Sequence, residues 1–410
     1  MLKKSLALFL VSVTLFAQDV TLKLSGFVKF DAELNTRNVS AARESYFVFY
    51  PAPESLDLNN EDKNEVPNLG FYTIHSRLNL KATGPEIFGA KTFGVLEGDF
   101  FGTSSAYTGM LRMRIATINF NWENTSLKLG QDWHPLFNCL TIANSPKVNA
   151  GTGFQPFGRF PQIQVSQKLT NEFKLTATLL SQRDFASVGL SGSADNLQIK
   201  NSLIPETVLQ FDFTPDKHLF GAGIEFLSLI PQTTTSNGYK TSKRVNSFTP
   251  FGYFKVDLSA VTISGKAVLA QNLTHLLYIG GFGVTKVDAV TAEYEYKPLS
   301  TLGGWLDFNY KLDNNISFGV YGGYSKVLTS SEKFINVYGR GITTSSKTGI
   351  ENLYRVSPRF VYTEKNLKLY TQAELTSAGY GTFTTNTDFK FNNVKQVSNI
   401  TFLIGTQYSF

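Results

Sequence analysis

The chain has 410 residues, of which 17% are charged and 14% are aromatic, and its net charge at neutral pH is +6. Soluble globular chains usually carry about 25% charged residues, so this composition argues against a disordered chain and against a coiled coil. A single cysteine, Cys139, excludes an intramolecular disulfide framework and any zinc or iron–sulfur site built from several cysteines. Four histidines leave little for a metal site, so we expect neither a bound metal nor a cofactor.

The first residues have the order of a secretory signal peptide. Two lysines precede an apolar run over residues 6–16, and Ala17 follows that run. The run of about eleven residues is shorter than the roughly 20 that a membrane-spanning helix needs. We therefore expect a signal peptide over residues 1–17 and one β domain over residues 18–410. Loss of the two lysines lowers the net charge from +6 to +4, which is too small an excess to predict nucleic-acid binding.

Alternating apolar and polar residues dominate the rest of the chain. In the first such segment Leu22, Leu24 and Val28 fall on one face, and Lys23 and Lys29 fall on the other. A period of two predicts a β-strand with one apolar and one polar side. The pattern predicts about sixteen strands, over residues 21–34, 71–83, 91–102, 110–121, 125–133, 159–169, 172–182, 205–214, 217–229, 247–258, 259–272, 301–312, 314–327, 351–364, 366–377 and 395–410.

The connections between these segments alternate between short turns and long loops. Short ones contain turn residues, such as Asn171-Glu172 and Asp313-Asn314-Asn315, whereas the join at 258–260 contains no Gly, Asn or Pro. Most segments reach the roughly 9–11 residues that a tilted strand needs to cross a bilayer, whereas strands of a soluble β-sandwich have about 5–6.

An open sheet edge in lipid would leave backbone N–H and C=O groups unpaired, so a membrane sheet has to close on itself. We therefore predict an all-β fold, a transmembrane antiparallel β-barrel of about sixteen strands in the bacterial outer membrane, surrounded by lipid. An even number of strands places both termini on the periplasmic side, where the turns are short.

The last residues carry a further signal. Tyr408 and Phe410 share a face with Phe402 and Ile404, so the final strand offers lipid an apolar stripe that ends in aromatic residues. Gly405 followed by these alternating aromatics also looks like the terminal signal of outer-membrane barrels. We therefore expect the barrel-assembly machinery to be a partner through the strand that ends at Phe410.

The polar face of the strands assigns charged residues to the lumen. Arginines on neighbouring strands would attract anions at a constriction, since their planar forks match carboxylate or phosphate. Alternatively, acids on adjacent strands neutralise these arginines. So many charges predict that water fills the interior. The candidate pore-lining residues are Arg77, Arg112, Arg114, Glu97, Asp99, Arg355 and Arg359, and the same face carries Lys29, Lys255, Asp31, Glu33, Asp212, Glu225, Asp257 and Asp307.

Two long loops bear on the shape of such a pore. Residues 134–158 contain Phe137, Phe154 and other apolar residues that suit a loop folded inward, although an external lid or a trimer contact would also use them. Residues 35–70 carry aromatics, among them Tyr46 and Phe47, ahead of an acidic run. This second loop would bind a partner or latch a neighbouring subunit.

Five short motifs follow one another in the N-terminal third: GFVKFDA at 26–32, SRL at 76–78, LEGDFFG at 96–102, LRMR at 111–114 and GQDW at 130–133. In this order they resemble the DcaP-like family of trimeric outer-membrane porins, and the rest of the chain matches only in pattern. The resemblance implies a sixteen-stranded barrel, a homotrimer and diffusion of small, often negatively charged solutes such as dicarboxylates. Its inward arginines would correspond to Arg77, Arg112 and Arg114.

Two features depart from that family. The first strand follows the expected signal peptide almost directly, without the coiled-coil extension of some members. His134 also follows Trp133, where the family more often has a small hydroxyl residue. Both departures bear on whether the family's substrates apply to this chain, and neither bears on the prediction of a barrel.

Catalysis finds no support in the sequence. The four histidines, which are His75, His134, His218 and His275, lie in separate segments, and no nucleophile motif or metal-binding pair flanks them. We expect a porin and not an enzyme: a channel for passive diffusion of small hydrophilic solutes, with a mild preference for anions such as dicarboxylates. The alternative is a surface adhesin or structural barrel that acts through its long loops and conducts no ions.

Overall fold

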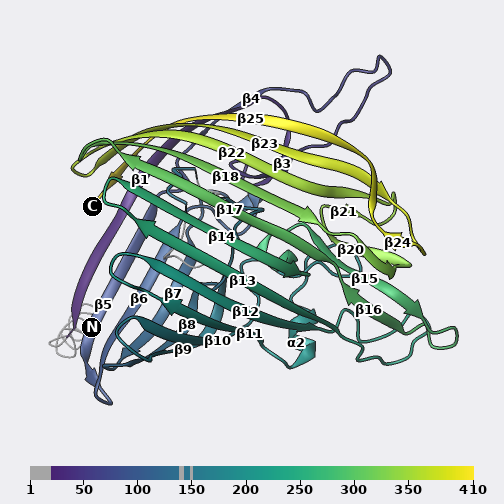
Figure 1. The fold of residues 1–410 in the computed structure, drawn as a ribbon, viewed down its shortest axis with the longest axis horizontal. Helices are drawn as coiled ribbons and strands as arrows, with labels where there is room; N and C mark the ends of the chain where they lie inside the picture. The colour runs from purple at the N-terminus through teal and green to yellow at the C-terminus, as the bar shows by residue number, and fades with distance from the viewer. Residues whose placement is uncertain (1–19, 138–142, 148–150) are drawn as a thin grey trace, which may run out of the picture.

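The computed structural model describes residues 20–137, 143–147 and 151–410, and their strands form a closed barrel (Figure 1). The expected signal peptide and Cys139 lie outside the described residues. β1 pairs antiparallel with β25, from Phe27 opposite Ser409 to Asn35 opposite Thr401, and pairs with β5 on its other side. The first and last strands therefore close the sheet, as the bilayer requires.

In the described part of the chain, the main sheet has eighteen strands. β4 and β5 are two parts of one barrel strand and β21 is a two-residue addition, which leaves sixteen strands around the barrel. They are β1 (Thr21–Asn35), β4 (Asn68–Tyr72) with β5 (Arg77–Ile87), β6 (Ala90–Asp99), β7 (Arg112–Asn121), β8 (Thr125–Trp133), β9 (Arg159–Lys168), β10 (Phe173–Leu180), β11 (Glu206–Phe213), β12 (Leu219–Leu229), β13 (Val245–Asp257), β14 (Val261–Gln271), β17 (Ser300–Lys311), β18 (Ile316–Val327), β22 (Thr348–Glu364), β23 (Leu367–Phe383) and β25 (Phe391–Ser409).

Each of the sixteen predicted segments is confirmed as a barrel strand, with ends shifted by a few residues. β1 begins and β25 ends at the same end of the barrel, where the turns are short (Figure 1). The join at 258–260, which lacks the usual turn residues, is a tight turn in which Ser259 has a positive φ of 68°. Its N–H donates to the Asp257 side chain over 3.0 Å, so an aspartate two residues earlier supplies the turn signal.

The outward face of the barrel is apolar. Leu22, Phe71 and Ile404 keep 65%, 67% and 67% of their surface exposed, whereas the inward Asp31 of β1 is fully buried. A continuous band of exposed apolar side chains is unfavourable in water and suits lipid. The alternation in the sequence therefore corresponds to a lipid-facing and a lumen-facing side.

None of the helices among the described residues has the length and apolarity that crossing a membrane would require.

The long connections carry small elements of their own. They are the hairpin β2 (Val39–Ala42) and β3 (Phe47–Pro51), the sheet of β15 (Gly280–Val287), β16 (Tyr294–Pro298) and β20 (Asn336–Arg340), the pair β19 (Ser330–Lys333) and β24 (Asp388–Phe389), β21 (Ile342–Thr343), helix α2 (Leu197–Ser202) and the 3-10 turns η1 (Ser105–Tyr107) and η2 (Thr274–Leu276). Of these elements, α2, β15, β16, β20, β21 and β24 lie at the end of the barrel opposite the short turns (Figure 1).

The described parts of segment 134–158, which joins β8 to β9, fold into the lumen. Its Lys147 reaches Glu33 of β1 at 3.2 Å and Glu374 of β23 at 3.5 Å, far around the barrel from β8. The Trp305 indole N–H of β17 donates to Gln155 over 2.6 Å. The sequence leaves open an inward loop, an external lid or a trimer contact, and the described parts of this loop adopt the inward arrangement.

The β2–β3 hairpin also turns inward. Tyr46 at its tip is fully buried, donates its hydroxyl to Asp31 and stacks on Tyr72 with ring centroids 4.4 Å apart. Phe47 keeps 5% of its surface exposed and packs on Phe157. The expectation that these two aromatics face an external partner is therefore wrong, because they fill the lumen.

The expectation that water surrounds the charged wall is also wrong on the side of the long loops. Asp31, Glu33, Glu225 and Asp307 keep no more than 1% of their surface exposed. The inward segments cover this part of the wall, and the buried acids have cationic or histidine side chains close by. Such charges need partners, because a bare ion in a dry interior is costly.

Candidate functional site

A cavity of about 640 Å³ lies in the lumen, between the inward segments and the barrel wall. It extends from the arginines of β5 and β7 to residues near the short turns, such as Lys311 and Thr363. Among the described residues that line it, ten are basic and one, Asp257, is acidic. The basic residues are Lys29, Arg43, Arg77, Arg112, Arg114, Lys147, Arg159, Lys255, Lys311 and Lys368. The surface of this cavity is therefore rich in cationic side chains.

One side of the cavity is a wall of arginines that carboxylates hold from behind. Arg112 of β7 donates its Nε and Nη2 to Asp99 over 2.7 and 3.1 Å. Arg114 donates its Nε to Glu97 over 2.7 Å and its Nη1 to Asp99 over 2.8 Å. Arg77 lies 3.7 Å from Glu97. The inward side chains of β5, β6 and β7 thus form one row of paired charges across neighbouring strands.

Aromatic rings support the same arginines from the side. The guanidinium carbon of Arg77 lies 5.2 Å from the centre of the Phe27 ring, and that of Arg114 lies 5.4 Å from Trp133. Arg112 lies 5.1 Å from Phe101. Carboxylates on one side and ring faces on the other restrict each guanidinium group, so these cations are held in defined positions.

The loop after β10 contributes a further acid to the arginine wall. Asp184 accepts from Nε and Nη2 of Arg159 over 2.9 and 2.5 Å, and Arg112 Nη1 lies 3.8 Å away. Burial of Asp184 opposes ionisation, but the charges of Arg159 and Arg112 outweigh it and hold its pKa below the usual range. The carboxyl group is therefore a fixed negative charge at neutral pH.

The side of the cavity nearer the short turns carries lysines without acidic partners among the described residues. Lys255 of β13, Lys311 of β17 and Lys368 of β23 line the cavity, and their ammonium groups make no ion pair or hydrogen bond within the described ranges. None of the three is fully buried. Water and mobile ions therefore solvate them, and their charge reaches the lumen uncompensated by the protein.

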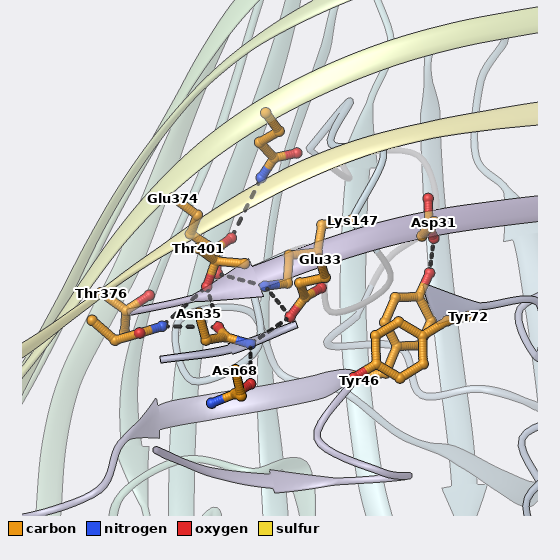
Figure 2. A network of polar contacts seen from close by, with 12 residues as sticks. Asp31, Glu33, Asn35, Tyr46, Asn68, Tyr72, Lys147, Glu374, Thr376 and Thr401 are labelled. Carbon is orange, nitrogen blue, oxygen red and sulfur yellow. Dashed lines mark hydrogen bonds and ion pairs between the residues drawn. The ribbon is translucent and has the colours of Figure 1, made fainter. Parts of the chain in front are cut away.

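The inward loop brings its own cation across the lumen. Figure 2 shows Lys147 between Glu33 and Glu374, beside the polar side chains Asn35 and Thr401. Asn35 donates to Glu33 over 3.3 Å, and Thr401 donates to the amide oxygen of Asn35 over 2.7 Å. Lys147 is itself fully buried. The network fixes the loop against β1 and β23 and so sets one boundary of the cavity.

The predicted site residues separate into three groups. Arg77, Arg112 and Arg114 line the cavity, and Glu97 and Asp99 lie behind them as their partners. The pairing of these arginines with acids on the adjacent strand, which is one of the two alternatives that the sequence presents, is therefore observed.

Arg355 and Arg359 lie elsewhere. Arg355 is buried beneath the inward loop, where it contacts Glu374 at 3.4 Å and donates to Thr376 over 2.9 Å. Arg359 donates two hydrogen bonds to Asp307, of 2.6 and 2.9 Å. Neither is among the residues that line the cavity, so both contribute to the wall and the loop rather than to its surface.

Sequence reasoning missed several cations of the cavity. Arg43 and Lys147 come from loops, which have no periodicity to show where a side chain points. Arg159, Lys311 and Lys368 stand near the ends of strands. An inward parity extended to the strand ends identifies Lys311 and Lys368. Arg159 shares the parity of the outward Ile163 and Val165, so it needs the fold, as the loop cations do.

Comparison with known proteins gives the same architecture. No family model matches the chain, and no curated protein does. Among solved structures, the outer membrane channel DcaP of Acinetobacter baumannii is similar with a TM-score of 0.70 at 15% identity, over 96% of this chain and 98% of that one. An anion-selective porin from Comamonas acidovorans has a TM-score of 0.55 at 11% identity, over 96% and 100%. OmpF of Salmonella typhi has 0.55 at 10%, over 95% and 97%.

The chain therefore has the fold of outer-membrane porins, a closed sixteen-stranded barrel. Its similarity to the DcaP channel, which the N-terminal motifs predict, is confirmed at the level of the fold. At these identities the comparisons carry no further conclusion about solutes.

Proposed function

We propose that the protein is an outer-membrane porin for passive diffusion of small hydrophilic solutes, with a preference for small anions such as dicarboxylates. Residues 1–17 would be its signal peptide and residues 18–410 its barrel. The observation that carries this proposal is the lining of the lumen cavity, with ten basic residues against one acidic residue. Such a lining lowers the energy of an anion in the channel and raises that of a cation.

The mechanism is attraction followed by release, without bond chemistry. Arg112 and Arg114 each use two of their nitrogens in hydrogen bonds to carboxylates, and Nη1 of Arg112 lies 3.8 Å from Asp184. The N–H groups without a carboxylate hydrogen bond, on Nη1 of Arg112 and Nη2 of Arg114, would be the ones to meet a solute. A dicarboxylate would interact with these N–H groups at one end and with the solvated lysines at the other. Since conduction requires binding that is favourable but weak, partly neutralised arginines suit a passing anion better than free ones.

A homotrimer forms part of this proposal. One of the similar solved structures, OmpT of Vibrio cholerae with a TM-score of 0.55 at 11% identity, is described as a trimer form. We also propose that the barrel-assembly machinery recognises the strand that ends at Phe410, because aromatic residues alternate at the end of that strand. Neither point affects the selectivity of a single barrel.

Solute flux into liposomes tests the proposal. The purified full-length protein is reconstituted, and swelling rates are compared for a dicarboxylate, a neutral polyol and a diamine of similar size. A porin with this lining passes the dicarboxylate several times faster than the diamine, with the neutral solute between them. Equal rates for all three would leave a pore but remove the anion preference, and no swelling with any solute would favour an adhesin or structural barrel.

A further inference from the structure

A second cluster of ionisable residues lies apart from the lumen cavity. His134 follows β8, Glu206 begins β11, Glu225 lies on β12, and His275 belongs to η2. All four side chains are fully buried, and none of them lines the cavity. They come from four segments far apart in the sequence, so the fold alone brings them together.

The ligand atoms of His134, Glu206 and His275 lie within 4.8 Å of one another, and Glu225 lies beside His275. His134 Nε2 lies 2.6 Å and His275 Nε2 lies 3.1 Å from the same atom, Glu206 Oε1. Glu225 Oε1 lies 4.0 Å from His275 Nε2. Ligand atoms around a tetrahedral zinc ion are about 3.3 Å apart, as follows from bonds of about 2.0–2.1 Å. Small side-chain movements convert the present spacing into a coordination shell.

The hydrogen bonds of His134 define its part. The Leu136 N–H donates to His134 Nδ1 over 3.1 Å, so in the neutral ring the proton resides on Nε2 and is donated to Glu206. His134 is therefore a positioning residue for that carboxylate. His275 Nε2 also lies within hydrogen-bond distance of Glu206 Oε1, and its Nδ1 has no partner in the described chain, so metal binding at Nε2 would move the ring proton to Nδ1.

The remaining unsatisfied atoms also belong to this cluster. Oε2 of Glu206 and both oxygens of Glu225 lack a hydrogen bond of ordinary geometry among the described residues. Another cation close to His134, Lys266, donates to the carbonyl oxygens of Leu136 and Phe137. Two fully buried carboxylates with unsatisfied oxygens are costly unless one of them is protonated or a cation compensates them.

We propose that His275, Glu206 and Glu225 bind a divalent transition-metal ion of the zinc type, with His134 holding Glu206 in position. One such ion balances two carboxylates, and an imidazole with two carboxylates is a donor set that zinc accepts. A hydrogen bond from His134 to a ligating carboxylate is the usual outer support of such a site. The proposal does not depend on the solute that the channel passes.

A metal at this position would join four segments. It would link β11 and β12 to η2 and, through His134, to the start of the inward loop. The same region already holds a backbone hydrogen bond of 3.1 Å from Phe157 to Leu276. The metal would therefore stabilise the inward fold of segment 134–158.

Metal binding to the folded barrel tests this inference. The purified full-length protein is treated with chelator, loaded with Co²⁺ or Zn²⁺ and freed of excess metal. We expect one ion per chain by elemental analysis, visible Co²⁺ bands of a four-coordinate site, and a higher unfolding temperature in the metal-loaded form. Absence of stoichiometric metal in protein that remains folded would overturn the proposal.

Variants separate ligands from other histidines and acids. Glu225→Gln and His275→Gln should abolish stoichiometric binding, whereas His134→Asn should weaken affinity about 10–100-fold, as loss of an outer-shell partner does. His218→Gln, in the short turn before β12, is the matched control and should bind as wild type. Resistance to detergent denaturation confirms folding, and the nearly isosteric Glu225→Gln keeps the test valid if His275→Gln does not fold. Equal binding by Glu225→Gln and wild type would refute the assignment.

Discussion

The two sides of the lumen cavity carry similar charge in different ways. On β5–β7 the arginines Arg77, Arg112 and Arg114 are held by Glu97 and Asp99 and packed against aromatic rings. Nearer the short turns, lysines of β13, β17 and β23 line the cavity and have no acidic partner among the described residues. The paired side has fixed geometry and a small net charge. The solvated side supplies net charge without fixed geometry.

This difference assigns separate physical roles to the two sides. A buried ion pair contributes little net stability, but removal of one member leaves the other uncompensated and costs roughly 3–5 kcal/mol. An exposed lysine can be removed with almost no change in stability. Charge removed from either side should alter ion selectivity, whereas only the paired side should also alter stability. The changes below test that distinction.

Removal of the arginines should have the largest effect. In Arg77→Ala/Arg112→Ala/Arg114→Ala, the acids behind them lose their cations, so the free energy of unfolding should fall by at least about 3–5 kcal/mol. The reversal potential in a salt gradient should move from anion to cation preference. Denaturant unfolding and bilayer recordings measure the two effects, and Arg183→Ala, in an exposed loop position, is the control. Unchanged selectivity in a folded triple variant would sink the role of the arginine wall.

Lys147 extends the paired behaviour to the inward loop. Lys147→Gln keeps the length of the side chain but leaves Glu33 and Glu374 without the cation they share. We expect a loss of about 3 kcal/mol in the free energy of unfolding and a larger, noisier single-channel conductance, because the loop is less firmly attached. Thermal unfolding and single-channel recording test this. Wild-type values for both would mean that the loop does not depend on this network.

The solvated side should show the reverse pattern. Lys255→Gln/Lys311→Gln/Lys368→Gln removes the same charge as the arginine triple, so the anion-to-cation permeability ratio should fall several-fold. The free energy of unfolding should stay within about 0.5 kcal/mol of wild type. The control removes three lysines from the long-loop end, Lys286, Lys297 and Lys395, which lie in exposed ion pairs. A similar shift in that control would show that selectivity does not arise in the cavity.

Substitution of Asp184 should produce the smallest change in ion selectivity, and this change should have the opposite sign. Asp184→Asn removes a negative charge beside Arg159 and Arg112, so the anion preference at neutral pH should rise by less than about twofold, as expected for a screened single charge. Because the pKa of Asp184 is held below its usual range, wild type should approach the variant only when the pH falls below about 4. Its stabilising contribution is present above that range and is lost as the pH falls through the folded pKa. Reversal potentials measured across pH check both signs.

The sequence predicts the barrel well because its determinants are local. A period of two identifies each strand, as in β1 and β17, and turn residues mark the ends. Parity then gives the side on which Arg77, Arg112 and Arg114 lie. Each of these inferences uses residues within one strand or its turn.

The positions of the side chains that fill the lumen depend on contacts between residues far apart in the sequence. The position of Lys147 between β1 and β23 depends on a loop that crosses the barrel, and loops have no periodicity. His134 and His275, which look unrelated in the sequence, meet because the residue after β8 and the turn η2 both reach Glu206 at the start of β11. The dry, paired state of Asp31 and Glu33 likewise follows from loops that cover them.

The most direct test of the central claim is the reversal potential of the wild-type protein, reconstituted in a planar bilayer that separates two concentrations of potassium chloride. A cavity lined by ten basic residues and one acidic residue predicts stepwise conductance and a potential of the sign set by chloride, larger at low than at high salt because screening weakens the field. Stepwise conductance with a potential of the sign set by potassium would contradict this account of selectivity, and absence of any conductance would contradict the porin itself.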